Sequence, residues 1–151
     1  MRFTRFAFSL LTFAAILSAA DPLVGTWKLN PAKSVFSKGN PPKEQTLTIM
    51  EHGTDIHVVV KGTTAEGTAI NSSFMIPAKG GTGKIIESAY EGVVGKVINA
   101  NERETTYSKG GKAVYHTHTT LLPGGKTLKV TAKGTNVAGK EVDGAVYYDK
   151  Q

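Results

Sequence analysis

Hydrophobic and polar residues alternate with a period of two along most of the chain after residue 22. This alternation is typical of β-strands that bury one face and expose the other. Helical spacing of apolar residues is confined to the first twenty residues. Ten stretches fit the pattern and are predicted to be strands: 23–29, 44–51, 55–61, 68–76, 84–88, 93–99, 103–109, 112–122, 126–135 and 141–149.

Glycine-rich turns separate these stretches. Gly110-Gly111 predicts a two-residue hairpin, because glycine tolerates the positive φ angles of tight primed turns. Residues 123–125, Pro-Gly-Gly, fit a three-residue loop built on a type I turn. Strands joined by hairpins form an up-and-down antiparallel sheet, and a sheet of this size closes to remove its edges. The predicted fold is therefore all-β, an up-and-down antiparallel β-barrel of about 8–10 strands.

One long segment, 30–43, does not fit the strand pattern. It contains Pro31, Pro41 and Pro42, and proline is excluded from central strands because it lacks the backbone N–H. We expect this segment to wrap one end of the barrel, with Phe36 tucked in.

The two hairpin turns predict which residues face each other on three neighbouring strands. A Gly110-Gly111 loop pairs Lys109 with Lys112, and a 123–125 loop pairs Leu122 with Lys126. The two registers together collect one set of residues on one face: Arg103, Thr105, Tyr107, Val114, His116, His118, Leu128, Val130 and Ala132. The opposite face is mostly threonine, glutamate and lysine, so we predict that the first set points into the barrel.

An interior that holds one arginine and two histidines is unusual for a filled core. Buried charge is costly unless it is paired, and a cavity with water or a polar-headed ligand would lower that cost. Eight strands already enclose one small ligand, and ten leave more room.

The first twenty residues match a secretory signal peptide. Arg2 and Arg5 precede an apolar run, and small residues stand at 18–20, where a signal peptidase cleaves. The predicted domains are therefore a signal peptide, 1–20, and one barrel domain, 21–151. The apolar run is too short for a stable membrane span. We expect the mature protein to be secreted or periplasmic, without an integral membrane span.

Composition excludes several classes of function. The chain has no cysteine, so disulfides, thiolate metal sites and a cysteine nucleophile are ruled out. The mature part keeps 16 Lys and Arg against 12 Asp and Glu, but only Arg103 is an arginine and the lysines lie beside turns. Nucleic-acid binding requires a concentrated basic patch, so we predict no nucleic-acid partner.

Gly25-Thr26-Trp27 resembles the Gly-x-Trp signature on the first strand of lipocalins and their wider calycin relatives. A more specific resemblance is to bacterial lipocalin-like (calycin-type) secreted proteins of unknown function. It covers nearly all of residues 23–151 and is carried by these runs: 25–30, 32–34, 45–49, 110–112, 125–127, 133–136, 139 and 147–151.

This resemblance implies a lipocalin/fatty-acid-binding-protein-like barrel in which Gly25 and Trp27 close one end. It also implies ligand binding without naming a ligand. The Thr-Asp-Tyr signature of the main lipocalins and the helical lid of fatty-acid-binding proteins are absent from the sequence. The arginine that stacks on the lipocalin tryptophan is missing too, and Lys140 and Lys150 are the candidates for its place.

Arg103 has two interpretations. It could bind a carboxylate or other anionic head group together with Tyr107 and His118, because a guanidinium offers two parallel donors and tyrosine a neutral one. Fatty-acid-binding barrels use an inward arginine and tyrosine in this way. Alternatively, Arg103 lies at the rim and pairs with Glu102 or Glu104.

His116 and His118 also have two interpretations. Side chains at i and i+2 of a strand share a face, about 7 Å apart, which makes them weak candidates for metal or haem ligands. A zinc site needs three or four ligands, and no inward carboxylate is evident nearby. Polar lining of a cavity is the competing interpretation, so no metal or cofactor is predicted.

Catalytic motifs are not found in the sequence: it has no G-x-S-x-G, phosphate loop or dinucleotide fingerprint. We therefore predict a non-enzymatic, monomeric carrier or sensor of a small hydrophobic or amphipathic molecule, including one with a carboxylate head. The predicted ligand-binding residues are Arg103, Thr105, Tyr107, Val114, His116, His118, Leu128 and Val130. The alternatives are a metal- or haem-binding barrel and a filled barrel that acts through its surface in the envelope.

Overall fold

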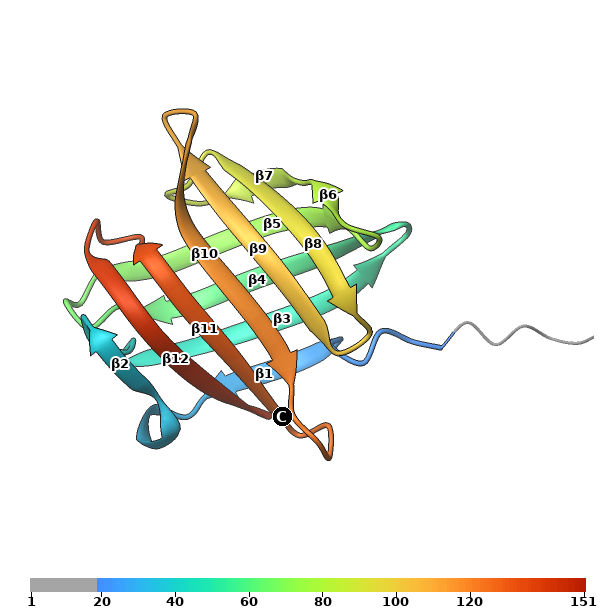
Figure 1. Cartoon of the computed structure of the whole chain (residues 1–151), viewed down its shortest axis with the longest axis horizontal. Helices are drawn as coiled ribbons and strands as arrows, with labels where there is room; N and C mark the ends of the chain where they lie inside the picture. The colour runs from blue at the N-terminus through green and yellow to red at the C-terminus, as the bar shows by residue number, and fades with distance from the viewer. Residues whose placement is uncertain (1–18) are drawn as a thin grey trace, which may run out of the picture.

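The computed structural model describes residues 19–151. Most of the predicted signal peptide, 1–18, lies outside this range. The described chain forms one antiparallel sheet and a short 3-10 helix, η1 (Pro31–Lys33) (Figure 1). The strands are β1 (Gly25–Leu29), β2 (Val35–Lys38), β3 (Glu44–His52), β4 (Asp55–Thr63), β5 (Ala69–Pro77), β6 (Gly81–Thr82), β7 (Lys84–Glu87), β8 (Gly92–Asn99), β9 (Glu102–Lys109), β10 (Lys112–Leu121), β11 (Thr127–Thr135) and β12 (Glu141–Lys150).

Strand order follows sequence order around the barrel. From β8 to β12 each strand pairs with the next, β1 joins β12 to β3, and β3 to β5 continue the meander. In Figure 1 the β8–β12 half crosses in front of the β1–β5 half. The predicted all-β, up-and-down antiparallel barrel is confirmed. The sheet has twelve strands instead of about 8–10, because β2 and β6, both very short, carry no alternating pattern.

The seam of the barrel lies between β5 and β8. The segment that joins them pairs first with β8 through β6 and then with β5 through β7, so it bridges both edges. Gly83 stands at the switch, and its amide donates to the Val93 carbonyl at 2.9 Å. A Cβ at Gly83 would lie 2.3 Å from the Met75 carbonyl oxygen. The backbone at Gly83 therefore lies so close to β5 that only glycine fits at this position of the seam.

The proline-rich segment also has more structure than the sequence predicts. After η1, β2 runs antiparallel to β12. Phe36 of β2 packs against the hydrophobic core, as predicted. A Cβ at Gly144 of β12 would lie 2.5 Å from the Phe36 ring, so this glycine lets the aromatic side chain reach the barrel.

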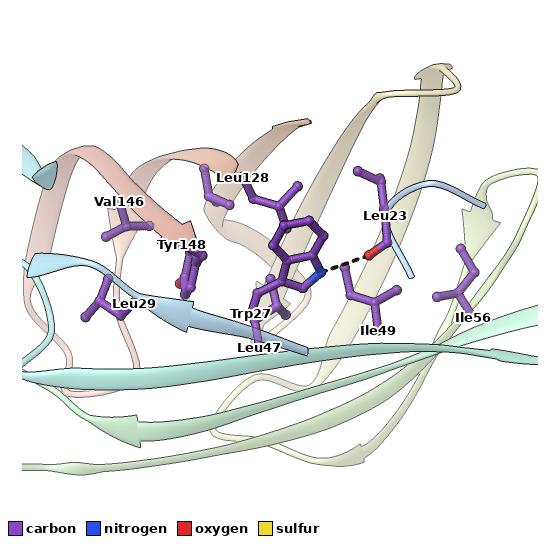
Figure 2. Packing of buried hydrophobic residues seen from close by; sticks show 10 residues of the cluster. Leu23, Trp27, Leu29, Leu47, Ile49, Ile56, Leu128, Val146 and Tyr148 are labelled. Atoms are coloured by element: carbon purple, nitrogen blue, oxygen red, sulfur yellow. Dashed lines mark hydrogen bonds between the residues drawn. The ribbon is translucent and has the colours of Figure 1, made fainter. Parts of the chain in front are cut away.

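Trp27 fills the end of the barrel at which β1 begins. It is 0 % exposed, and Leu23, Ile49 and Leu128 pack near it (Figure 2). Its indole Nε1 donates to the Leu23 carbonyl at 3.0 Å, which satisfies the one polar atom of a buried tryptophan.

Lys150 covers the Trp27 ring from the C-terminal strand. Its ammonium lies 5.1 Å from the ring centroid, within the range of a cation–π contact. A Cβ at Gly25 would lie 3.1 Å from the Lys150 Cε, so glycine at this position leaves space for the lysine. Of the two candidate lysines, Lys140 and Lys150, it is Lys150 that lies over the Trp27 ring.

The predicted register of β10 is wrong. Lys109 pairs with Lys112 as expected, but a bulge between Ala113 and Tyr115 shifts the rest of the strand by one residue. Because strand side chains alternate between faces, a one-residue shift reverses the whole strand. Tyr115, Thr117 and Thr119 face inward, whereas Val114, His116 and His118 do not line the interior.

The second turn is also one residue longer than predicted. Leu121 pairs with Leu128, and the Leu122 amide donates to the Thr127 carbonyl. This shift cancels the first one. As a result Arg103 and Thr105 of β9 and Val130 of β11 share the inner face, as predicted.

Gly134 makes room for the bulge. It pairs with Tyr115 across β10 and β11, and its φ is 120°. A Cβ at Gly134 would lie 2.2 Å from the Val114 carbonyl oxygen and 3.0 Å from the Tyr115 Cα. Both contacts are with backbone, which a rotamer change does not relieve.

We predict that Gly134→Ala lowers the free energy of unfolding by at least about 3 kcal/mol, because it adds a backbone clash to a strained φ. Gly124→Ala is the matched control, since Gly124 also has a positive φ but a Cβ there would meet nothing within 4 Å. The control should lose only about 1–2 kcal/mol. Urea unfolding measures both, and equal losses would contradict the role of Gly134.

Candidate functional site

A cavity of about 170 Å³ lies inside the barrel between its two halves. A single buried water needs about 10–15 Å³, so this space is more than ten times larger. One wall is aliphatic and comes from β3, β4 and β5, with Leu47, Val58, Val60 and Ile70 in the lining. The opposite wall comes from β9 to β12 and carries most of the hydroxyl groups.

Three tyrosines, Tyr90, Tyr107 and Tyr115, form an aromatic wall with Phe74 in this cavity. The Tyr90 and Tyr115 rings are stacked, with centroids 5.7 Å apart and planes 8° apart. Tyr107 lies 5.0 Å from Tyr90 and 5.6 Å from Tyr115, and it meets Phe74 edge-on at 5.5 Å. Tyr148 lines the cavity from β12.

The tyrosine hydroxyls differ in their partners. Tyr90 donates to the Thr135 carbonyl at 2.9 Å, and Tyr148 donates to Oε1 of Gln45. The Thr117 side chain lies close enough to the Tyr107 hydroxyl to affect its pKa. For the Tyr115 hydroxyl, the described residues 19–151 supply no hydrogen-bond partner.

These tyrosines stay neutral because the interior disfavours negative charge. Burial raises the pKa of Tyr115 to about 12. Burial also raises the pKa values of Tyr90 and Tyr148, and negative charge on Tyr115 or Tyr107 would raise them further. For Tyr107 burial again raises the pKa most, and the Thr117 side chain opposes it in part.

Arg103 lines the cavity but is already paired. Its guanidinium donates to the Asp21 carboxylate, and their side chains are only 20 % and 13 % exposed. The other Asp21 carboxylate oxygen accepts the Leu23 amide at 2.9 Å. Neither predicted alternative names this partner, because Asp21 lies 82 positions away in sequence. The pair ties the N-terminal segment to β9 beside Leu23.

His116 and His118 lie on the outer face of the barrel, so the interpretation in which they line the interior is wrong. His116 Nδ1 is 3.1 Å from the Thr106 hydroxyl, and His118 Nε2 is 3.9 Å from a Glu102 carboxylate oxygen. Within residues 19–151, no group of three or more His, Cys, Asp or Glu side chains is placed to hold a metal ion.

The remaining predicted site residues lie in three places. Thr105 and Val130 line the cavity together with Arg103 and Tyr107. Leu128 is fully buried in the cluster around Trp27 and is not part of the cavity lining. Val114 is the extra residue of the bulge. Their roles in ligand binding stay predictions.

Sequence reasoning missed Tyr90, Tyr115 and Tyr148 as site residues. The sequence did contain a signal for Tyr115. One face of its strand carries Tyr115 and Leu121, whereas the face predicted to be buried carries two histidines. On the last strand Val146 and Tyr148 face inward and are 5 % and 4 % exposed.

One serine has a histidine neighbour that the sequence did not reveal. His57 Nε2 lies 2.8 Å from the Ser73 hydroxyl across β4 and β5. Both side chains point away from Phe74 and the cavity, which they do not line. The pair therefore joins two strands on the outer face, outside the site.

The comparisons with known proteins give one similar solved structure. It is the crystal structure of zebrafish ileal bile acid-binding protein complexed with cholic acid, with a TM-score of 0.47 and 14 % sequence identity over 86 % of this chain and 99 % of that chain. No family model matches the chain, and no curated protein matches it. Function is therefore inferred from the cavity itself.

We predict that stability falls as the pH rises from about 10, where unfolded tyrosine ionises, toward about 12, the pKa of folded Tyr115. Across this range the unfolded chain loses a proton that folded Tyr115 keeps, so the loss is on the order of 2 kcal/mol for this residue. Urea unfolding at several pH values should show a smaller loss for Tyr115→Phe. Identical alkaline losses in both proteins would refute the prediction.

Proposed function

We propose that this protein is a binding protein for a small hydrophobic or amphipathic molecule held inside the barrel. The observation that carries the proposal is the cavity, which is lined mainly by aliphatic and aromatic side chains with a few hydroxyls. Such a site gives affinity by burying apolar surface and orientation through a small number of polar groups. The resemblance carried by Gly25-Thr26-Trp27 points in the same direction.

The size of the cavity favours a bound guest over a filled barrel. An apolar cavity of about 150 Å³ stays free of water and binds benzene, and this cavity is of similar size at about 170 Å³. Empty space of this size costs a protein stability, because the lining loses its packing contacts. A ligand would restore those contacts.

Secretion and removal of 1–20 are part of the proposal. The described residues 19–151 contain no helix that is both long and apolar enough to span a membrane. Ala19 and Ala20 are exposed, and the Asp21 backbone nitrogen lies 3.2 Å from a Glu51 carboxylate oxygen. Cleavage after Ala20 would turn this nitrogen into an ammonium group opposite that carboxylate, a favourable pairing.

We expect the protein isolated from the envelope or culture medium to have the mass of the 131 residues 21–151. Mass spectrometry of the intact chain measures this directly. Recovery of the full 151-residue chain from those fractions would contradict processing at this site.

We expect Ala132→Phe to abolish ligand binding while the barrel still folds, because Ala132 lies in the cavity lining and a phenyl group would occupy the space. Lys133→Phe is the matched control, since Lys133 is the next residue on the same strand and its side chain points outward. Native mass spectrometry should show an added mass on the wild-type and control proteins that is missing from Ala132→Phe. A bare mass for all three would count against a carrier.

A further inference from the structure

The cavity contains no unpaired charge within the described part of the chain. Three charged side chains reach its lining, all near the end at which β9 begins: Lys96, Arg103 and Glu104. Lys96 and Glu104 pair with each other at 3.4 Å, and Arg103 pairs with Asp21. The Arg103 Nε is unpartnered but fully enclosed. A carboxylate ligand would have to displace Asp21 or enter without a counter-ion, and an unpaired buried charge is costly.

Away from that end, the polar groups of the cavity are neutral. Tyr90 and Tyr148 already donate their hydroxyl protons to Thr135 and Gln45. The Tyr115 hydroxyl has no partner among residues 19–151, yet it is not among the fully enclosed unpaired atoms, so it borders open space in the cavity. A phenol both donates and accepts. Tyr115 therefore offers a guest one neutral hydrogen bond.

The surroundings of this hydroxyl suit a flat ring. The stacked pair of Tyr90 and Tyr115, with Tyr107 beside both, forms a continuous aromatic surface. Aromatic rings prefer offset-stacked or edge-to-face contacts at the centroid distances found here. Val58 and Val60 line the facing aliphatic wall, so a ring between the two walls would have apolar contacts on both faces.

We propose that the guest is a neutral molecule with one aromatic ring and one uncharged polar group, whose ring contacts the Tyr90, Tyr107 and Tyr115 surface and whose polar group bonds the Tyr115 hydroxyl. This inference rests on the proposed function and narrows its ligand class. The carboxylate-headed ligand of the sequence-based hypothesis is disfavoured, since the carboxylate site on Arg103 is filled by Asp21. The raised pKa values of the tyrosines agree, because the same interior that opposes tyrosinate opposes a ligand anion.

Four probes with equal numbers of heavy atoms test this inference at neutral pH by NMR titration. Acetophenone is neutral and aromatic with a hydrogen-bond acceptor, benzoate carries the charge, isopropylbenzene lacks the acceptor, and cyclohexyl methyl ketone lacks the aromatic ring. We expect acetophenone to bind tightest and benzoate to bind at least about tenfold more weakly. A tenfold difference in Kd corresponds to about 1.4 kcal/mol of binding free energy. Benzoate binding equal to acetophenone binding would overturn the inference.

Tyr115→Phe keeps the ring and removes the hydroxyl. It should weaken acetophenone binding by about 3–10-fold, the usual effect of one neutral hydrogen bond, and leave isopropylbenzene binding unchanged. Tyr147→Phe is the control, because Tyr147 does not line the cavity. Equal acetophenone affinities for the two variants would also overturn the assignment.

The outcomes separate this inference from the proposed function. If none of the four probes binds but the native protein carries a mass that Ala132→Phe loses, the ligand class is wrong and the carrier function stands. If no probe binds and no mass is carried by any form, both fail.

Discussion

The interior depends on one extra residue in β10. If Val114 were in regular register, Val114, His116 and His118 would point into the barrel, and two imidazoles would need partners there. The bulge sends them outward and brings in Tyr115, which completes the aromatic wall. Gly134 permits the bulge by having no Cβ against the Val114 carbonyl. Bulges that re-aim side chains are common beside functional sites, and this one decides the chemistry of the cavity.

The barrel has an end packed around Trp27 and a cavity that begins beside it. Trp27, Leu23 and Leu128 are almost completely buried at the packed end. There Lys150 covers the Trp27 ring, and the Asp21–Arg103 pair holds the segment before β1 against β9. Tyr90, Tyr107 and Tyr115 lie farther along, where β9 ends and β10 begins. The packed cluster and the cavity share residues, since Leu23, Leu47 and Ile49 belong to both, whereas Trp27, Leu29 and Leu128 belong to the cluster alone.

Sequence patterns predicted the strands well, because the alternation of hydrophobic and polar residues reflects which face of each strand is buried, independently of the other strands. All ten predicted strands exist, with bounds that differ by a few residues. The turn at Gly110-Gly111 was also predicted correctly, since both glycines have the positive φ angles, 57° and 73°, that its chemistry requires. The site was harder to predict, because the residues that face each other on neighbouring strands depend on the exact length of every turn and bulge between them. The bulge at Val114 and the longer turn after Leu122 each shifted the register by one residue, so β9 and β11 were placed correctly and β10 was reversed.

Contacts between distant parts of the sequence explain the rest of the difference. Asp21 and Arg103 meet only because β1 closes the barrel between β12 and β3, and no local pattern marks them as partners. Because of this pairing, Arg103 is a neutralised part of the cavity wall and not a free anion-binding site. At the opposite end, the lining comes from turn and segment residues such as Asn40, Ala65 and Val137. The packed end is therefore fixed by side-chain contacts, whereas the shape of the other end is set by its turns, which are the parts of a barrel that vary most easily.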